Sequence, residues 1–267
     1  MRGWTEHGDG VFSKRYASID LTIGLVVCET GLVVIDTRAT HDQARDLQAD
    51  IRALTRKPVR WIVNTHHHWD HTFGNAVFED ADIWGHTRCA AALVECGEDM
   101  RARVKEFAPG FGDELDDVVI TPPTHTFDDA ATVSFGGRRL ELRHLGRGHT
   151  DNDIVIRVPD DDVLFAGDLV EEGAPPAFGD AFPLEWPETM ERLLEMVAGP
   201  VVPGHGATVG HLHVETQSEE IASVAELARA RYAEGMTPEE AAAAGGPYPT
   251  DTLVQAFGRA WRQLEGS

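Results

Sequence analysis

Cysteine is scarce in this sequence, with three residues in a chain of 267. Cys28, Cys89 and Cys96 are odd in number and show no C-x-x-C spacing, so neither a disulfide framework nor a cysteine zinc site is indicated. Because disulfides persist mainly in oxidising compartments, we expect a reducing compartment and assign the protein to the cytoplasm.

Long apolar runs are missing as well. No segment approaches the roughly 20 apolar residues that a membrane helix needs, and residues 1–10 contain no apolar core of a signal peptide. We therefore expect no membrane span and no membrane partner.

Positive charge is in deficit: 23 Lys and Arg stand against 45 Asp and Glu, which gives a net charge of -22. An acidic surface repels phosphate backbones, so we expect a small-molecule substrate and no nucleic-acid partner. With 42% hydrophobic residues, the chain can bury a large core. We expect one domain over residues 1–267, with a core of about 10–235 and a helical tail, 236–267, that packs back or pairs in a homo-oligomer.

What the chain does contain is a compact group of potential metal ligands in an H-x-H-x-D-H pattern: His66, His68, Asp70 and His71. The pattern directly follows the apolar run 59–64. A strand ending there would leave these side chains in a loop at a sheet edge, where they can converge on an ion while His67 and Trp69 point elsewhere. Histidine clusters also form weak adventitious sites, so the hexad alone does not decide.

Three further candidate ligands stand at the ends of other predicted strands, each flanked by glycine. They are His149 in G-R-G-H-T, Asp168 in F-A-G-D and His205 in P-G-H-G. Glycine lets the backbone turn tightly without a Cβ clash and so brings the ligand inward. Together the candidates supply enough nitrogen and oxygen ligands for two zinc ions with open positions for water and substrate.

In this order the motifs resemble those of the metallo-β-lactamase superfamily, and the ligand set is similar to that of glyoxalase II. The resemblance covers most of the chain. It implies one zinc held by His66, His68 and His149, a second zinc held by Asp70, His71 and His205, and Asp168 as the bridge between them. It also implies that Asp36, at the end of the early strand 31–37, supports the metal loops, although the residues alone are equally consistent with a plain turn.

The periodicity of the chain predicts strands alternating with helices in two halves. Helices are expected at 40–54, 87–107, 214–234 and 251–264, strands at 131–135, 138–145, 154–158 and 163–166, and a loop region at 108–128. Because an apolar sheet face must be covered, helices on the outsides of two facing sheets would give an α/β layered sandwich. The four-layer αββα form, here with a C-terminal helical extension, is what the resemblance implies.

The segment from Glu171 to Pro187 is too long for a tight connection and follows a proposed ligand. It carries the aromatic residues Phe178, Phe182 and Trp186. We predict that these rings form one wall of a substrate pocket, since apolar side chains commonly surround a polar centre. The alternative is a surface cover that packs the same rings on the core.

The predicted chemistry is hydrolysis by a binuclear zinc centre that generates hydroxide at neutral pH. The hydroxide would attack a carbonyl polarised by the first zinc, and Asp70 would act as a catalytic residue by helping to orient it. Esters, thioesters, lactones and amides are all open to this reaction.

Two alternatives remain on the same scaffold. Imidazole and carboxylate ligands also suit iron or manganese, so an iron-dependent oxidoreductase similar to sulfur dioxygenases is one of them. The other is a β-lactamase of weak activity, since one group of true β-lactamases in this superfamily uses cysteine where Asp168 stands and another lacks the bridging aspartate.

Overall fold

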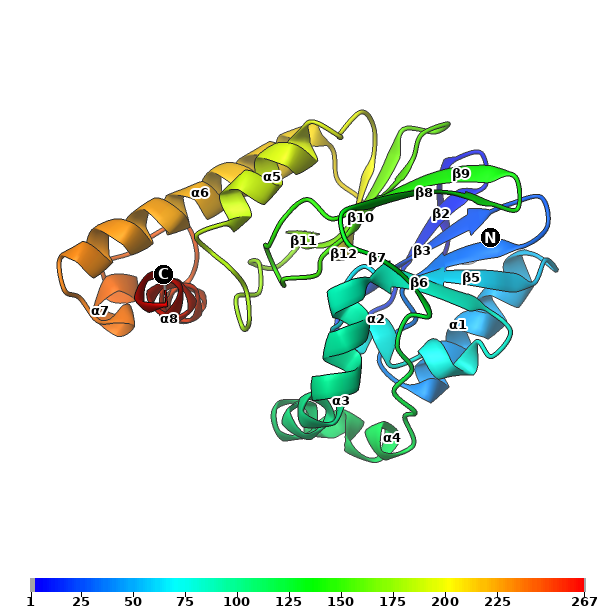
Figure 1. Ribbon diagram of the computed structural model, residues 1–267, viewed down its shortest axis with the longest axis horizontal. Helices are drawn as coiled ribbons and strands as arrows, with labels where there is room; N and C mark the ends of the chain where they lie inside the picture. Colours follow the sequence, from blue (N-terminus) through cyan, green and yellow to red (C-terminus); the bar gives the residue numbers. More distant parts are fainter. Residues whose placement is uncertain (1–2, 267) are drawn as a thin grey trace.

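Two β-sheets face each other at the centre of the molecule (Figure 1), in a computed structural model that describes residues 3–266. The first sheet has the order β1-β2-β3-β4-β5-β6-β7. Strands β1 to β4 are antiparallel and β4 to β7 are parallel, so the loops after β4, β5 and β6 leave the sheet at one edge. The strands of this sheet are Thr5–Gly8, Val11–Arg15, Thr22–Val27, Leu32–Ile35, Val59–Val63, Asp82–His86 and His125–Phe127.

The second sheet has the order β12-β11-β10-β9-β8. Strands β8 and β9 form a hairpin that turns at Gly136 and Gly137, whose φ values of 50° and 89° suit a two-residue turn that glycine adopts readily. Strand β12 is parallel to β11, and the other pairs are antiparallel. The strands are Ala130–Phe135, Arg138–Arg143, Val155–Val158, Val163–Glu171 and Val201–His205.

The alternation of side chains along β4 creates the first two interfaces. Val33 and Ile35 face the second sheet, whereas Leu32 and Val34 face outward under helix α1 (His41–Leu54). Helix α1 begins as predicted, because the hydroxyl of its N-cap Thr40 accepts a hydrogen bond from the Gln43 backbone N–H at 3.2 Å. Helices α2 (Trp69–Thr72) and α3 (Thr87–Phe107) lie on the same side of the molecule (Figure 1).

Strand β11 shows the same alternation in the second sheet. Phe165 points into the core between the sheets, while Leu164 and Ala166 join a separate apolar cluster on the outer face. That outer cluster contains side chains from α5 (Trp186–Leu194), α6 (His211–Ala233), α7 (Pro238–Ala243) and α8 (Thr250–Glu265). The four-layer αββα sandwich and its C-terminal helices are therefore confirmed.

Three differences between the predicted and the observed elements exceed two residues. Strand β11, expected to end at residue 166, continues to Glu171 because both of its faces are covered and all nine of its residues are buried. The expected loop at 108–128 contains the 3-10 turn η2 (Pro109–Phe111), helix α4 (Gly112–Asp116) and the edge strand β7, elements too short to show periodicity. Helix α6 begins three residues earlier than predicted, at His211.

A second 3-10 turn, η1 (Asn75–Val77), follows α2. Within residues 3–266, no helix combines the length and the apolar character needed to cross a membrane.

We expect Gly24→Ala to lower the free energy of unfolding by about 1–3 kcal/mol, because Gly24 faces the opposite sheet at close range. A Cβ on Gly24 would lie 2.5 Å from Cε1 of Phe165 and 3.0 Å from Cβ of Ile35. The matched control is Gly258→Ala in α8, where a Cβ would have no neighbour within 4 Å. Alanine there should stabilise by about 0.5–1 kcal/mol. Equal midpoints for Gly24→Ala and the wild type in chemical denaturation would contradict the close approach.

Candidate metal centre

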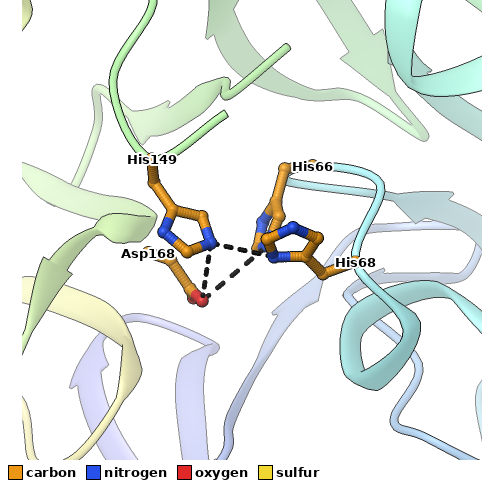
Figure 2. Close-up of side chains that lie close together, drawn as sticks. All are labelled: His66, His68, His149 and Asp168. Atoms are coloured by element: carbon orange, nitrogen blue, oxygen red, sulfur yellow. Dashed lines mark hydrogen bonds and ion pairs between the residues drawn. The ribbon is translucent and has the colours of Figure 1, made fainter. Parts of the chain in front are cut away.

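The seven predicted ligands reach one edge of the two sheets from four separate segments. The H-x-H-x-D-H hexad follows β5 and leads into α2, His149 lies in the loop between β9 and β10, Asp168 lies in β11, and His205 ends β12. Figure 2 shows His66, His68, His149 and Asp168 pointing toward one another. Segments far apart in the chain thus place their polar side chains in a common space.

The first group consists of His66, His68, His149 and Asp168, and each of these residues offers a ligand atom within 4.8 Å of the others. Nε2 of His149 lies 2.9 Å from Nδ1 of His68. The second group consists of Asp70, His71 and His205. Nε2 of His205 lies 3.2 Å from Oδ2 of Asp70 and 3.4 Å from Nε2 of His71.

Asp168 lies between the two groups. Its Oδ2 is 3.7 Å from Nε2 of His66 and 3.5 Å from Nε2 of His149, in the first group, and 3.4 Å from Nε2 of His205, in the second. Its Oδ1 is 3.2 Å from Nε2 of His71, in the second group. One carboxylate therefore faces both sets of ligands, as a bridging ligand must.

Backbone conformation at two glycines makes room for this carboxylate. Gly167 has φ of 54°, and a Cβ there would lie 2.8 Å from Cβ of Thr65. A Cβ on Gly204, in the neighbouring strand β12, would overlap the Asp168 carboxylate. The two glycines thus allow the neighbouring segments to pack close to Asp168, because a larger residue at these positions would push Asp168 out of the centre.

Each of the five histidines has one ring nitrogen held by an acceptor outside the centre. Nδ1 of His149 donates to the carbonyl of Ala177 at 3.1 Å, and Nδ1 of His205 donates to the carbonyl of Ile19 at 2.8 Å. Nε2 of His68 donates to both carboxylate oxygens of Asp180 at 3.1 Å. These bonds fix the ring orientation and leave the other nitrogen, with its lone pair, facing inward.

Asp36 holds the remaining two histidines. Its Oδ2 accepts from Nδ1 of His71 at 2.7 Å and from the Thr65 hydroxyl at 2.7 Å, while Oδ1 accepts from the Thr65 backbone N–H at 2.8 Å. The Thr65 hydroxyl oxygen lies 3.0 Å from Nδ1 of His66 and accepts a hydrogen bond from it. Asp36 has φ of 63°, an uncommon value for a residue other than glycine, and these bonds hold it there. Asp36 is thus a supporting residue of the ligand loop as well as a turn residue.

The electrostatics differ among the five histidines but do not follow the two groups, because in the first group burial lowers the pKa of His68 and Asp180 outweighs burial and raises it. Burial lowers the pKa of His66 well below its ordinary value and that of His149 to about 4, so both are neutral at pH 7 and able to bind a cation. Burial acts in the same direction on the pKa of His71 and His205, but nearby carboxylates, Asp168 foremost, raise both pKa values well above the ordinary value. In the metal-free protein, protons on His71 and His205 thus balance the charge of Asp70 and Asp168.

The donor set fits divalent metal ions, because two inward-facing atoms are buried without a hydrogen-bond partner. These are Nε2 of His66 and Oδ1 of Asp168. Leaving such atoms unsatisfied in the interior is costly, and a coordinated cation would satisfy both. Imidazole nitrogens with carboxylate oxygens are ligands of zinc, and they also suit iron.

His67 and Trp69 were predicted to point away from the metal ligands, and each has a contact outside the two ligand groups. Nδ1 of His67 lies 2.9 Å from the side-chain amide of Asn152, and the Trp69 ring packs 5.2 Å from the ring of Phe111. Neither side chain belongs to the two ligand groups described above, but both line the cavity over the centre, and His67 forms a third candidate group with His68 and Asp180.

Three residues important at this centre carry no motif and were missed. Asp180 is the partner of His68 from 112 positions away, and Thr65 links Asp36 to His66. Glu171, at the end of β11, lines the adjacent cavity, and burial raises its pKa to about 8. The contacts of Asp180 and Glu171 depend on the path of the loop after β11, which local sequence does not specify.

A cavity of about 570 Å³ opens over the ligands. Its walls come from the β2–β3 loop, from α3 and from the loop after β11, and its floor includes His68, Asp70, His149, Asp168 and His205. The centre is therefore accessible to a small molecule.

The predicted aromatic wall of this cavity is wrong. Phe178 and Trp186 are fully buried in the cluster that covers the second sheet, with ring centroids 5.3 Å apart. Phe182 instead lies beside the guanidinium groups of Arg147 and Arg259. The loop uses its aromatic rings to attach itself to the apolar core, as the alternative interpretation held, and turns small and polar residues such as Ala177 and Asp180 toward the cavity.

Comparison with known proteins agrees with this geometry. The metallo-beta-lactamase superfamily matches residues 22–205, a segment that includes all seven ligands. The metallo-beta-lactamase type 2 of Bacteroides fragilis is 30% identical over 188 residues, 68% of this chain and 70% of that protein. An acyl-coenzyme A thioesterase of Homo sapiens is 29% identical over 240 residues, 78% of this chain and 83% of that protein.

A solved structure extends the similarity in fold beyond the matched segment. The stereoselective inverting sec-alkylsulfatase from Pseudomonas sp. superposes with a TM-score of 0.80 at 18% identity, over 99% of this chain. This chain spans half the length of that one. Because the superfamily matches residues 22–205 and a member of it is 30% identical over 68% of this chain, the chain belongs to the metallo-beta-lactamase superfamily.

Proposed function

We propose that the protein is a binuclear zinc hydrolase that cleaves a carbonyl substrate, an ester, thioester, lactone or amide. The observation that carries the proposal is the convergence of seven candidate ligands, each histidine with one ring nitrogen directed at the centre, at the floor of an open cavity. The relatives named above are hydrolases, which supports a metal-dependent hydrolase in general. Among carbonyl compounds, the similarity to an acyl-coenzyme A thioesterase supports thioesters.

His66, His68 and His149 would hold one ion, Asp70, His71 and His205 the other, with Asp168 shared. When bound, such ions supply a Lewis acid and lower the pKa of water toward 7. The residues of the chain have separate tasks. Asp70 lines the cavity, and its Oδ2 lies 3.2 Å from Nε2 of His205. Its carboxylate can therefore accept a hydrogen bond from a water or a substrate hydroxyl in the cavity and orient it.

Asp36, Thr65 and Asp180 keep the imidazoles from rotating, so the ligand geometry is formed before substrate enters.

The direct test is metal analysis of protein purified without added metal, followed by a panel of ester, thioester, lactone and β-lactam substrates. Two zinc ions per chain with turnover of at least one carbonyl class is the expected result. Stoichiometric iron with oxygen consumption would instead favour the oxidoreductase alternative, and preferential turnover of β-lactams the β-lactamase alternative. Two zinc ions with no turnover of any class would contradict a hydrolytic role.

Asp168→Ala should reduce bound metal from two ions to about one and lower kcat/KM by at least roughly a hundredfold, because the shared carboxylate is lost. Metal content and steady-state kinetics measure both effects. Asp160→Ala, at an exposed aspartate in the turn between β10 and β11, is the matched control and should change neither. If Asp168→Ala retains two ions and the wild-type rate, the bridging assignment is wrong.

Metal binding at pH 7 should release protons, because the raised pKa values of His71 and His205 leave both protonated in the metal-free protein. A cation must displace these protons, so apparent affinity should rise with pH by about tenfold per pH unit for each proton displaced. Zinc titration of metal-free protein in weak buffer, with the released acid measured, is expected to give up to two protons per chain. Affinity that does not change between pH 6 and pH 8 would contradict this assignment of charge.

A further inference from the structure

We propose that the substrate is an amphiphile with a single negative charge, whose apolar segment lies along α3 and whose anionic group binds Arg103. This inference rests on the proposed hydrolysis of a carbonyl compound at the metal centre and names the class of that compound. It comes from the wall of the cavity opposite the loop after β11.

The C-terminal half of α3 presents four side chains to the cavity: Met100, Arg103, Val104 and Phe107. Their spacing of three, four and seven positions places them in one stripe on the helix surface. The Phe107 ring is 68% exposed and lies 6.3 Å from the ring of Trp69, which also lines the cavity. A large exposed ring beside a tryptophan at the mouth of a cavity is a suitable surface for an aliphatic or aryl segment.

Charge in the same cavity is distributed unevenly. Arg103 is the sole Lys or Arg among its lining residues, and within residues 3–266 its guanidinium has no hydrogen bond or ion pair. The chain has 45 acidic and 23 basic residues, so acidic partners for an arginine are plentiful. Arg103 nevertheless lies beside the metal centre without one. A bound anion would provide one, because guanidinium pairs readily with carboxylate.

The acidic residues of the lining are already engaged, so they do not compete for Arg103. Asp20 pairs with Arg15, with Oδ2 2.6 Å from Nη2, and Glu172 accepts from the Ala207 backbone N–H at 2.7 Å. Asp180 binds His68, and Glu171 is buried and accepts from the Ala177 backbone N–H at 3.1 Å. Arg103 is thus the one charged group of the wall left for a ligand, and a single arginine suits one anionic group better than a polyphosphate.

The experiment compares three 4-nitrophenyl esters on the holoenzyme: acetate, octanoate and the half-ester of suberic acid, which adds a terminal carboxylate to an eight-carbon chain. Phe107→Ser should lower the octanoate-to-acetate ratio of kcat/KM by about fivefold, since part of the apolar contact is lost. Arg103→Gln should lower the suberate-to-octanoate ratio by roughly fivefold or more.

Val94→Ser and Arg56→Gln are the matched controls, as both residues are exposed and outside the cavity, and neither should move the ratios. Ratios unchanged in both cavity variants, with esters still hydrolysed, would overturn the inference and leave the hydrolase standing. If no member of the ester, thioester, lactone and β-lactam panel is turned over, the proposed function fails, and calorimetric binding of the free octanoate anion decides the inference. Weaker binding to Phe107→Ser and Arg103→Gln supports it, and equal binding overturns it.

A separate observation connects the C-terminal helix to the metal centre, and from it we infer that Arg259 of α8 is a positioning residue for His68. Nη2 of Arg259 donates to the Asp180 carbonyl at 2.7 Å, and Nε donates to the Ala181 carbonyl at 2.9 Å. The Asp180 carboxylate in turn accepts from Nε2 of His68. Arg259 thereby fixes the backbone of the residue that fixes the ring.

The contact at Asp180 suits this arrangement, because both of its carboxylate oxygens lie 3.1 Å from Nε2 of His68. A carboxylate is a strong acceptor for the outer nitrogen of a metal-binding imidazole.

Arg259→Met should weaken retention of one of the two metal ions by about tenfold in competition with a chelator, with Asp180→Ala giving a similar loss. Cobalt-substituted protein should show an altered visible spectrum, and Arg259→Lys should recover part of both signals. Arg262→Met, an exposed arginine on the same helix, is the control and should resemble the wild type. If Arg259→Met does not fold, Arg259→Gln takes its place, and wild-type metal retention and spectrum in the folded variant that lacks the guanidinium would overturn the inference.

Discussion

The structure depends on a set of hydrogen bonds that face away from the centre they build. Every candidate histidine ligand is held through its outer nitrogen, by a carboxylate, a hydroxyl or a backbone carbonyl. Without these bonds the imidazoles could rotate, and the close approach of five rings and two carboxylates would be one arrangement among many. The elements of the fold can be understood as supports for these acceptors, since Ile19, Asp36, Ala177 and Asp180 lie in loops that the two sheets bring to a common edge.

The convergence of the seven candidate ligands could be predicted from sequence because it depends on local features. The hexad follows an apolar strand, and His149, Asp168 and His205 each stand beside glycine in a short motif, so residue type and spacing were sufficient to select them. The layered fold was predictable for a related reason. The four consecutive apolar residues Leu32 to Ile35 alternate between two apolar clusters, so this strand is buried on both faces.

The surroundings of the ligands could not be predicted, because they arise from contacts between distant segments. Asp180 pairs with His68, and nothing around Asp180 distinguishes it from other loop aspartates. Asp180 was missed, whereas the aromatic residues of the same loop were wrongly assigned to the cavity. Composition suggested a pocket wall at Phe178 and Trp186, yet burying two large rings stabilises the fold more than exposing them to a polar cavity. Sequence pattern reveals that a ring needs an apolar neighbour but not which surface provides one.

The apolar cluster that covers the outer face of the second sheet has a consequence for folding during synthesis. Phe257 and Trp261 of α8 belong to the same apolar cluster as Val155 and Leu164 of the sheet, with α5 and α6 between them in the chain. During synthesis the outer face of that sheet therefore stays partly bare until residue 261 has left the ribosome. A nascent chain that already carries all seven candidate ligands therefore keeps part of this apolar surface exposed until α8 has been made and can pack on it.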